Sequence, residues 1–174
     1  MADSGQLICV LAGPGSATKK VIPYCKGVMG RANIDYSDQP HEKASLLKII
    51  GNTFLLNMIE TLSEGHTLAE KSGLGNEKLH QFSETLFSGP YAAYSDRLMG
   101  GDYHKRDEPL FGVDLARKDV RHALNLAEST GTRMKAVEVA ESHLAAVQQH
   151  TGSKGDIAGI YGIVRQEAGL NFAN

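Results

Sequence analysis

The chain has 174 residues, and its 18 lysines and arginines nearly balance its 20 aspartates and glutamates. This length suits one substantial core with room for a small appended unit, but not two large domains. The balanced charge lacks the concentrated positive field that non-specific nucleic-acid binding needs, so nucleic acid is not expected as a partner.

The first forty residues predict a β-α-β unit. Residues 7–12 (LICVLA) form a short apolar run that suits a buried strand, and residues 13–15 (GPG) suit a turn. Ser16 is expected to cap a helix over residues 17–29, and residues 32–36 suit a second short strand. Such a unit cannot bury its own sheet, because a parallel pair needs further elements on both faces.

From residue 44 onward the pattern of apolar residues is helical. The longest helix is expected over residues 44–71, and its first half is apolar nearly all round, so we expect protein to enclose it on most sides. Glycines and one proline make residues 100–112 a predicted loop. The other expected helices cover residues 77–87, 91–99, 113–129 and 132–150, and a last one runs from a cap at Asp156 through Glu167.

Neither a membrane segment nor a cysteine framework is expected. Apolar stretches break well before the roughly 20 residues that cross a bilayer, and residues 1–6 lack the pattern of a signal peptide. A soluble, cytoplasmic protein is therefore predicted. Cys9 and Cys25 lack a CxxC spacing and are expected to be two reduced thiols in or near a core.

Lys48 and Asn52 are the first candidate site residues. They lie four apart inside the most apolar helix, so they share one helical face. A lysine in a partly desolvated cleft has a proton affinity lowered towards neutrality, which suits a general acid or base for a carbonyl/alcohol pair. The alternative is a lysine that extends to water beside an ordinary polar surface residue.

Lys118 and Asp119 are the second candidate pair. One interpretation is a cation for a cofactor next to a carboxylate that orients the Lys48 pocket. The other is a solvated charged patch on an amphipathic helix.

Two other motifs give weaker evidence of a functional site. Residues 13–18 (GPGSAT), with Asp35 downstream, imitate a dinucleotide fingerprint, but Thr18 replaces the third glycine and Pro14 lacks a backbone N–H. A plain strand-to-helix turn is the preferred interpretation. The seven histidines show no metal-ligand spacing, so no metal site is predicted, and His143 and His150 are expected to form an exposed polar stripe.

Three segments resemble the last part of the 3-hydroxyisobutyrate dehydrogenase and 6-phosphogluconate dehydrogenase-like (β-hydroxyacid dehydrogenase) superfamily. Residues 6–33 look like the final strand and helix of the nucleotide-binding domain, and residues 44–54 (ASLLKIIGNTF) look like the catalytic-lysine helix. Residues 111–130 are similar to the lysine-aspartate helix that closes over the cofactor. The resemblance runs from Leu7 through Leu170.

The resemblance implies a mainly α fold. Residues 41–174 would form a helical C-terminal substrate and dimerisation domain, like that of 6-phosphogluconate dehydrogenase. Residues 1–40 would be a short β-α-β remnant of a Rossmann domain. It also implies that Lys48 is the catalytic acid/base, that Asn52 and Asp119 bind substrate, and that Lys118 contacts NAD or NADP. The reaction would be reversible oxidation of a small 3-hydroxy acid to its semialdehyde or keto acid.

Two departures shape the functional expectation. Glu42 and Ala44 stand where the family has a Gly-x-Gly, and the family's amino-terminal Rossmann half is not in this sequence. We therefore expect residues 1–174 alone to bind cofactor weakly and to be inactive. The alternative is a non-catalytic helical dimerisation or interaction module, since the apolar residues 47–59 favour a homodimer. A small nucleotide binder using residues 13–18 ranks last.

Overall fold

The computed structural model describes residues 3–87 and 89–174. Contacts between Cα atoms divide the chain into two compact units, Met1–Gly51 and Asn52–Asn174. The division falls inside the long helix α2 (Glu42–Lys71), so this helix contributes residues to both units.

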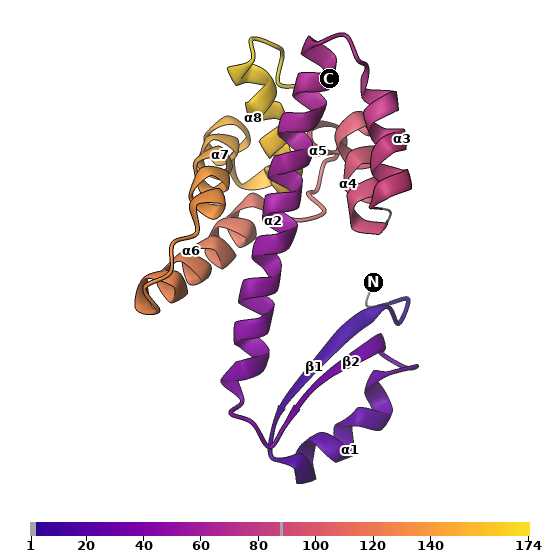
Figure 1. Ribbon diagram of the computed structural model, residues 1–174, viewed down its shortest axis with the longest axis vertical. Coiled ribbons are helices and arrows are strands. Elements are labelled where there is room, and N and C mark those ends of the chain that lie inside the picture. Colours follow the sequence, from indigo (N-terminus) through magenta and orange to yellow (C-terminus); the bar gives the residue numbers. More distant parts are fainter. Residues whose placement is uncertain (1–2, 88) are drawn as a thin grey trace. The chain divides into compact units, whose positions relative to one another are not determined.

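The first unit is the expected β-α-β arrangement. Strands β1 (Leu7–Gly13) and β2 (Gly30–Ser37) form a two-stranded parallel sheet, joined by helix α1 (Gly15–Cys25) (Figure 1). The helix ends four residues earlier than predicted, because Lys26 adopts an extended conformation and pairs with Gly30 at the start of β2.

The predicted cap of α1 is wrong. Ser16 does not cap the helix; Pro14 is its N-cap residue, and the Gly15 N–H donates to Asp38 Oδ1 at 2.7 Å. Asp38 follows β2 in the left-handed conformation, with φ of 62°, which brings its short side chain across to the start of α1. A residue distant in sequence therefore satisfies an N–H that the local sequence was expected to satisfy.

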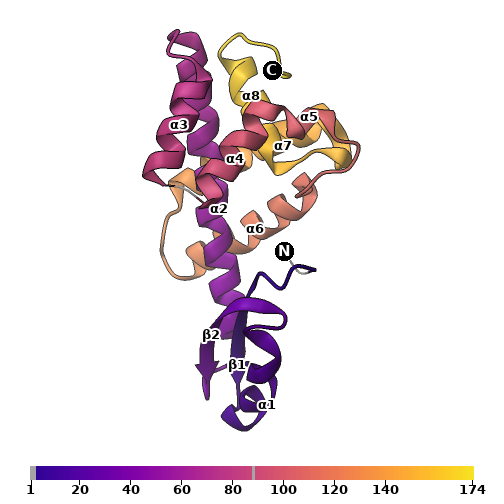
Figure 2. The same ribbon diagram turned by 90° about the vertical axis from the view of Figure 1, so that its right-hand side faces the viewer.

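The second unit consists of helices, most of them within a few residues of their predicted bounds (Figure 2). Residues 100–112, predicted as a loop, contain the short helix α5 (Asp102–Lys105), so the prediction is wrong for these four residues. Asp156 caps as predicted: its carboxylate accepts the Ala158 N–H at 2.8 Å. The elements after α2 are α3 (Asn76–Leu86), α4 (Gly89–Gly100), α5 (Asp102–Lys105), α6 (Val113–Ser129), α7 (Lys135–Thr151), η1 (Gly152–Lys154), η2 (Ile157–Gly159) and α8 (Ile160–Glu167).

One continuous core lies in the second unit, where α6 packs on α7 and α7 packs on α8. Its fully buried large side chains come from α2, α4, α7 and α8, and burying each contributes about 1.5–3 kcal/mol. They are Ile59, Leu98, Leu144, Ile160 and Tyr161. The mainly α fold with a small parallel sheet, predicted from the sequence, is thereby confirmed.

The most apolar part of α2 is not its most buried part. The buried residues of this helix begin at Thr53, and Phe54 remains 74% exposed. The expectation that protein encloses the first half on most sides is therefore wrong for this chain. From Thr53 onward α2 contributes to the core of the second unit, through residues such as Leu56 and Ile59.

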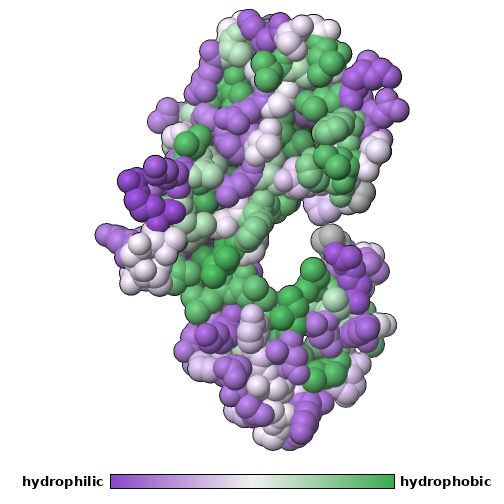
Figure 3. Space-filling view, in the orientation of Figure 1, coloured by the Kyte–Doolittle hydropathy of each residue, from purple (hydrophilic) through white to green (hydrophobic). Residues whose placement is uncertain are grey.

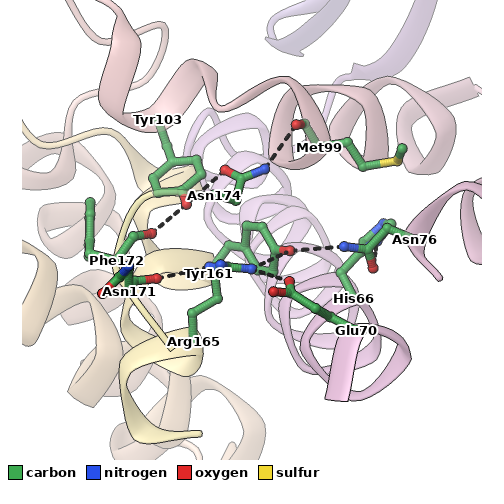
Figure 4. Close-up of polar contacts among 10 residues, drawn as sticks. All are labelled: His66, Glu70, Asn76, Met99, Tyr103, Tyr161, Arg165, Asn171, Phe172 and Asn174. Carbon is green, nitrogen blue, oxygen red and sulfur yellow. Dashed lines mark hydrogen bonds and ion pairs between the residues drawn. The ribbon is translucent and has the colours of Figure 1, made fainter. Parts of the chain in front are cut away.

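The C-terminal tail completes the core (Figure 4). The Tyr103 hydroxyl donates to the Phe172 carbonyl at 2.5 Å, and the Asn174 amide donates to the Met99 carbonyl at 2.9 Å. The Phe172 ring stacks on His150 with centroids 4.1 Å apart, and it also lies directly against the backbone of Gly162. A Cβ at position 162 would overlap this ring, so the close approach requires glycine there.

His66 is fully buried on α2 inside a polar cluster. Its Nδ1 lies 3.0 Å from Asn76 Oδ1, and its Nε2 lies 2.8 Å from Ser95 Oγ. The amide oxygen can only accept, so Nδ1 carries the proton and Nε2 accepts from the serine hydroxyl. The serine oxygen is also 2.9 Å from His80 Nδ1. This arrangement requires a neutral His66, and burial lowers its pKa below the ordinary value of 6.5.

Acidification should weaken the fold through His66. Its pKa is lower in the folded than in the unfolded chain, so below about pH 6.5 the unfolded state binds more protons and the free energy of unfolding falls. Above that pH the contribution of His66 is fully present. Urea unfolding measured across this range should show a shallower pH dependence for His66→Gln than for the parent chain. The exposed His122→Gln is the control, and an equal flattening by both variants would contradict the assignment.

Candidate functional site

Helices α2 and α6 carry the four residues that the sequence selected. Lys48 and Asn52 lie one turn apart on α2, and Lys118 and Asp119 are adjacent on α6. The buried stripe of α6 includes Ala116, Asp119 and Val120, so Asp119 points inwards while Lys118 lies at the edge of that stripe.

Asn52 and Asp119 meet directly, although 67 positions separate them in the sequence. The Asn52 amide donates to Asp119 Oδ2 at 2.6 Å, and the Lys118 ammonium lies 3.1 Å from Asp119 Oδ1. Both carboxylate oxygens therefore have a donor, as a carboxylate with only 7% of its surface exposed requires. The structure thus joins two motifs that the sequence identified separately.

Lys118 and Lys48 differ from Asp119 in their access to solvent. The Lys118 side chain is 46% exposed, so its remaining ammonium hydrogens can reach a ligand while Asp119 holds one side. Lys48 is exposed on α2, one turn before Asn52. Contacts within α6 and between α2 and α6 position Asn52, Lys118 and Asp119 relative to one another.

In the glycine-rich turn of the first unit, a side chain of the protein already occupies the start of α1. Asp38 already places a carboxylate on the Gly15 N–H, so a pyrophosphate at the start of α1 would meet a like charge. Asp35, the acidic residue of the apparent fingerprint, accepts the Ser37 N–H and hydroxyl at 2.8 and 2.5 Å. These bonds lower the pKa of Asp35, the hydroxyl having the larger effect. An open hollow of about 460 Å³ lies beside this turn, lined by Gly13, Pro14, Asp38, Gln39, Pro40 and His41.

His143 contradicts the expected exposed stripe. It is 9% exposed, and its Nδ1 lies 2.7 Å from Glu60 Oε1, while its Nε2 lies 3.4 Å from Glu167 Oε1. Burial raises the pKa of Glu60, and the nearby His143 opposes that rise. A signal existed in the sequence: His143 adjoins Leu144 and lies four residues before Val147, both fully buried on α7. Only His150 of that pair is exposed.

Further polar residues that sequence reasoning missed surround Tyr161 (Figure 4). Asn76 donates to the Tyr161 hydroxyl at 3.3 Å, and Arg165 donates to the same oxygen at 3.3 Å while pairing with Glu70. Because Tyr161 has no exposed surface, this cluster fastens helices together and offers no group to a ligand. No residue spacing in the sequence predicts this cluster, because its members come from α2, α3 and α8.

Within residues 3–87 and 89–174, no cluster of three or more histidines, cysteines or acidic residues is placed to hold a metal ion. Among the same residues, no helix is both long and apolar enough to cross a bilayer.

The mainly helical fold and the match to a family model place the chain in the β-hydroxyacid dehydrogenase class. Residues 43–164 match the family model for the NAD-binding region of NADP-dependent 3-hydroxyisobutyrate dehydrogenase. The match covers more than half of the chain, and the chain belongs to that family.

Two proteins of similar sequence are oxidoreductases. The chain is 32% identical over 174 residues to the NADH-dependent oxidoreductase ucdB of Aspergillus ustus, covering 99% of this chain and 58% of that protein. It is 31% identical over 134 residues to glyoxylate/succinic semialdehyde reductase 1 of Arabidopsis thaliana, covering 76% and 44%. The chain thus spans about half the length of these relatives.

Solved structures confirm the fold. The 3-hydroxyisobutyrate dehydrogenase ygbJ of Salmonella typhimurium superposes with a TM-score of 0.79 at 18% identity, covering 93% of this chain and 55% of that one. The Mycobacterium tuberculosis 3-hydroxyisobutyrate dehydrogenase, solved with L-serine, gives a TM-score of 0.75 at 18% identity, covering 94% and 57%. The protein Psf3, solved with NADP+ and 2-OPP, gives 0.74 at 16% identity, covering 94% and 55%.

The contact between Asn52 and Asp119 can be tested through stability. Asn52→Ala removes the amide that donates to a buried carboxylate, and we expect the free energy of unfolding to fall by about 1.5–3 kcal/mol. Equilibrium unfolding in urea measures this change. Asn125→Ala makes the same substitution at an exposed position of α6, so it controls for helix propensity. Equal effects of the two substitutions would show that the hydrogen bond contributes nothing.

Proposed function

We propose that this chain supplies the proton-transfer and substrate-binding side of an NAD(P)-dependent dehydrogenase that reversibly oxidises a small 3-hydroxy acid. The observation that carries the proposal is the hydrogen bond from Asn52 to Asp119, with Lys118 on the same carboxylate. It brings together the two motifs whose residue types and spacing resemble the catalytic and cofactor helices of this family. Family membership and the oxidoreductase relatives support the same reaction class.

Each side chain has a distinct role in this proposal. Lys48 exchanges a proton with the substrate hydroxyl oxygen as the carbinol and the carbonyl interconvert. Asp119 accepts one hydrogen of the Asn52 amide nitrogen, which fixes the amide plane. The second hydrogen of that nitrogen is then directed to a substrate oxygen. Asp119 orients Asn52 and Lys118 on the substrate side.

Lys118 fits the contact with the cofactor. Its ammonium is anchored on one side by Asp119 and nearly half of its side chain is open, so it can donate to a polar group of NAD or NADP. NAD or NADP held there would supply the hydride acceptor and donor for the carbinol carbon. The start of α1 does not fit a pyrophosphate because Asp38 occupies it. We therefore expect residues 1–174 alone to bind cofactor weakly and to turn over no hydroxy acid.

Lys48 gives the decisive kinetic test. Replacing it with alanine removes the proton carrier, and kcat for hydroxy-acid oxidation should fall by about 10²-fold or more. Lys48→Arg keeps the positive charge but cannot release a proton near neutral pH, so it should be equally impaired. Nicotinamide absorbance measures turnover, in the longest natural form of the protein that contains residues 1–174.

Lys71→Ala is the matched control, because Lys71 is an exposed lysine in the last turn of the same helix. It should retain the parent rate. Normal turnover by Lys48→Ala, or full activity of Lys48→Arg, would defeat the acid/base assignment.

We also propose that the chain forms a homodimer. The alternative to a dehydrogenase is then a non-catalytic module that acts through dimerisation. Ile50 and Phe54 lie one turn apart on α2 and are 45% and 74% exposed, and hydrophobic residues continue onto the visible surface along this helix (Figure 3). An exposed apolar helix face of this kind favours a second copy as its cover.

Sedimentation of the chain tests this proposal. The parent chain should sediment as a dimer, and Phe54→Ser should shift it towards monomer by at least about tenfold in the dissociation constant. Phe82→Ser is the control, because Phe82 is 57% exposed on α3 and lies off the α2 face. A parent chain that sediments only as monomer would exclude the dimer.

A further inference from the structure

The two cysteines of the chain lie in the same small unit. Cys9 is the third residue of β1 and is half-buried, whereas Cys25 is the last residue of α1 and is 1% exposed. They are the only cysteines in the sequence. Any intramolecular disulfide within these residues would therefore join this pair.

Both cysteines converge on Gly30, the first residue of β2. A Cβ at Gly30 would lie 3.1 Å from Cys9 Sγ, so the sulfur occupies the space that a side chain there would fill. On the other side, Lys26 pairs with Gly30, and the Gly27 N–H donates to the Gly30 carbonyl at 2.8 Å. The backbone that follows Cys25 is thus tied to the residue on which Cys9 packs.

The Cys25 thiol donates to the Val21 carbonyl at 3.5 Å, and its pKa also depends on Cys9. Burial and a hydrogen bond with Cys9 raise the pKa of Cys25. Cys25 therefore remains a protonated thiol at neutral pH, and the more accessible Cys9 is the sulfur that an oxidant meets first.

We propose that Cys9 and Cys25 are a redox-active thiol pair that a hydroperoxide converts into an intramolecular disulfide. The Cys9 thiolate attacks the O–O bond, an alcohol leaves, and Cys9 becomes a sulfenic acid. The Cys25 thiol then loses its proton as its sulfur attacks the sulfenic sulfur of Cys9, an S–S bond forms, the S–O bond breaks, and the hydroxyl group leaves with that proton as water. Overall, two thiols lose two electrons and two protons, while one hydroperoxide is reduced to one alcohol and one water.

The last turn of α1 can accommodate the shorter distance that a covalent bond requires. Pro23 lies inside this turn and lacks an N–H, so it removes one hydrogen bond from the segment that carries Cys25. The bond would close the loop of residues 9–25. It would also fasten the end of α1 to β1, in a unit whose two strands leave apolar residues exposed, among them Ile8 and Ile34.

The test uses the whole chain and tert-butyl hydroperoxide. Treatment should lower the intact mass by about 2 Da and remove both maleimide-reactive thiols, and dithiothreitol should restore them. Trypsin digestion without reduction should give residues 1–19 linked to residues 21–26, because Lys19, Lys20 and Lys26 are cleavage sites. Folding should accelerate the reaction at least about tenfold over the urea-unfolded chain, since proximity drives it.

Single substitutions provide the controls. Cys9→Ser should leave Cys25 slow to oxidise, whereas Cys25→Ser should leave Cys9 to form a sulfenic or sulfinic acid without the linked peptide. Three results would overturn the proposal: two thiols that stay maleimide-reactive after treatment, disulfides found only between chains, or equal rates in the folded and unfolded chain.

Discussion

A carboxylate that is almost removed from water has to be hydrogen-bonded or neutralised, and Asp119 meets this constraint with side chains from two helices. The amide of Asn52 comes from α2, and the ammonium of Lys118 comes from α6 itself. If either helix rotated by one residue, the carboxylate would lose a partner while remaining buried. The pairing therefore fixes the register between α2 and α6, and the candidate site inherits its geometry from that register.

The later turns of α2 repeat this device against other helices. Glu60 pairs with His143 on α7, His66 lies against Ser95 on α4, and Glu70 pairs with Arg165 on α8. Buried polar contacts of this kind contribute little net stability, but each one penalises a misaligned packing of its two helices. The long helix is thus positioned at several points along its length, and Asn52 is the first of them in the second unit.

Periodicity predicted the ranges of α2 and α6, because an amphipathic pattern depends on residues close together in the sequence. Asn52 and Asp119 belong to two separate motifs whose roles follow from the family resemblance, and the hydrogen bond that joins them across 67 positions does not follow from local pattern. Contacts between distant residues could not be predicted in this way. Asp38 caps Gly15 from 23 positions away, and the contact of His66 with Ser95 spans 29. The seven-residue spacing of His143 and His150 does not reveal that His143 is buried, because its partner Glu60 lies 83 positions away on α2.

The ring of Phe172 fills the space that a side chain at Gly162 would need, and this has an evolutionary consequence. The chain must keep a residue without a side chain at one position for as long as it keeps an aromatic ring at the other. Among homologues of this helical domain, the two positions are thus expected to vary together. A homologue with a larger residue at position 162 in α8 would then have a smaller residue at position 172 in the tail. Substitution at either position is therefore constrained by the residue at the other.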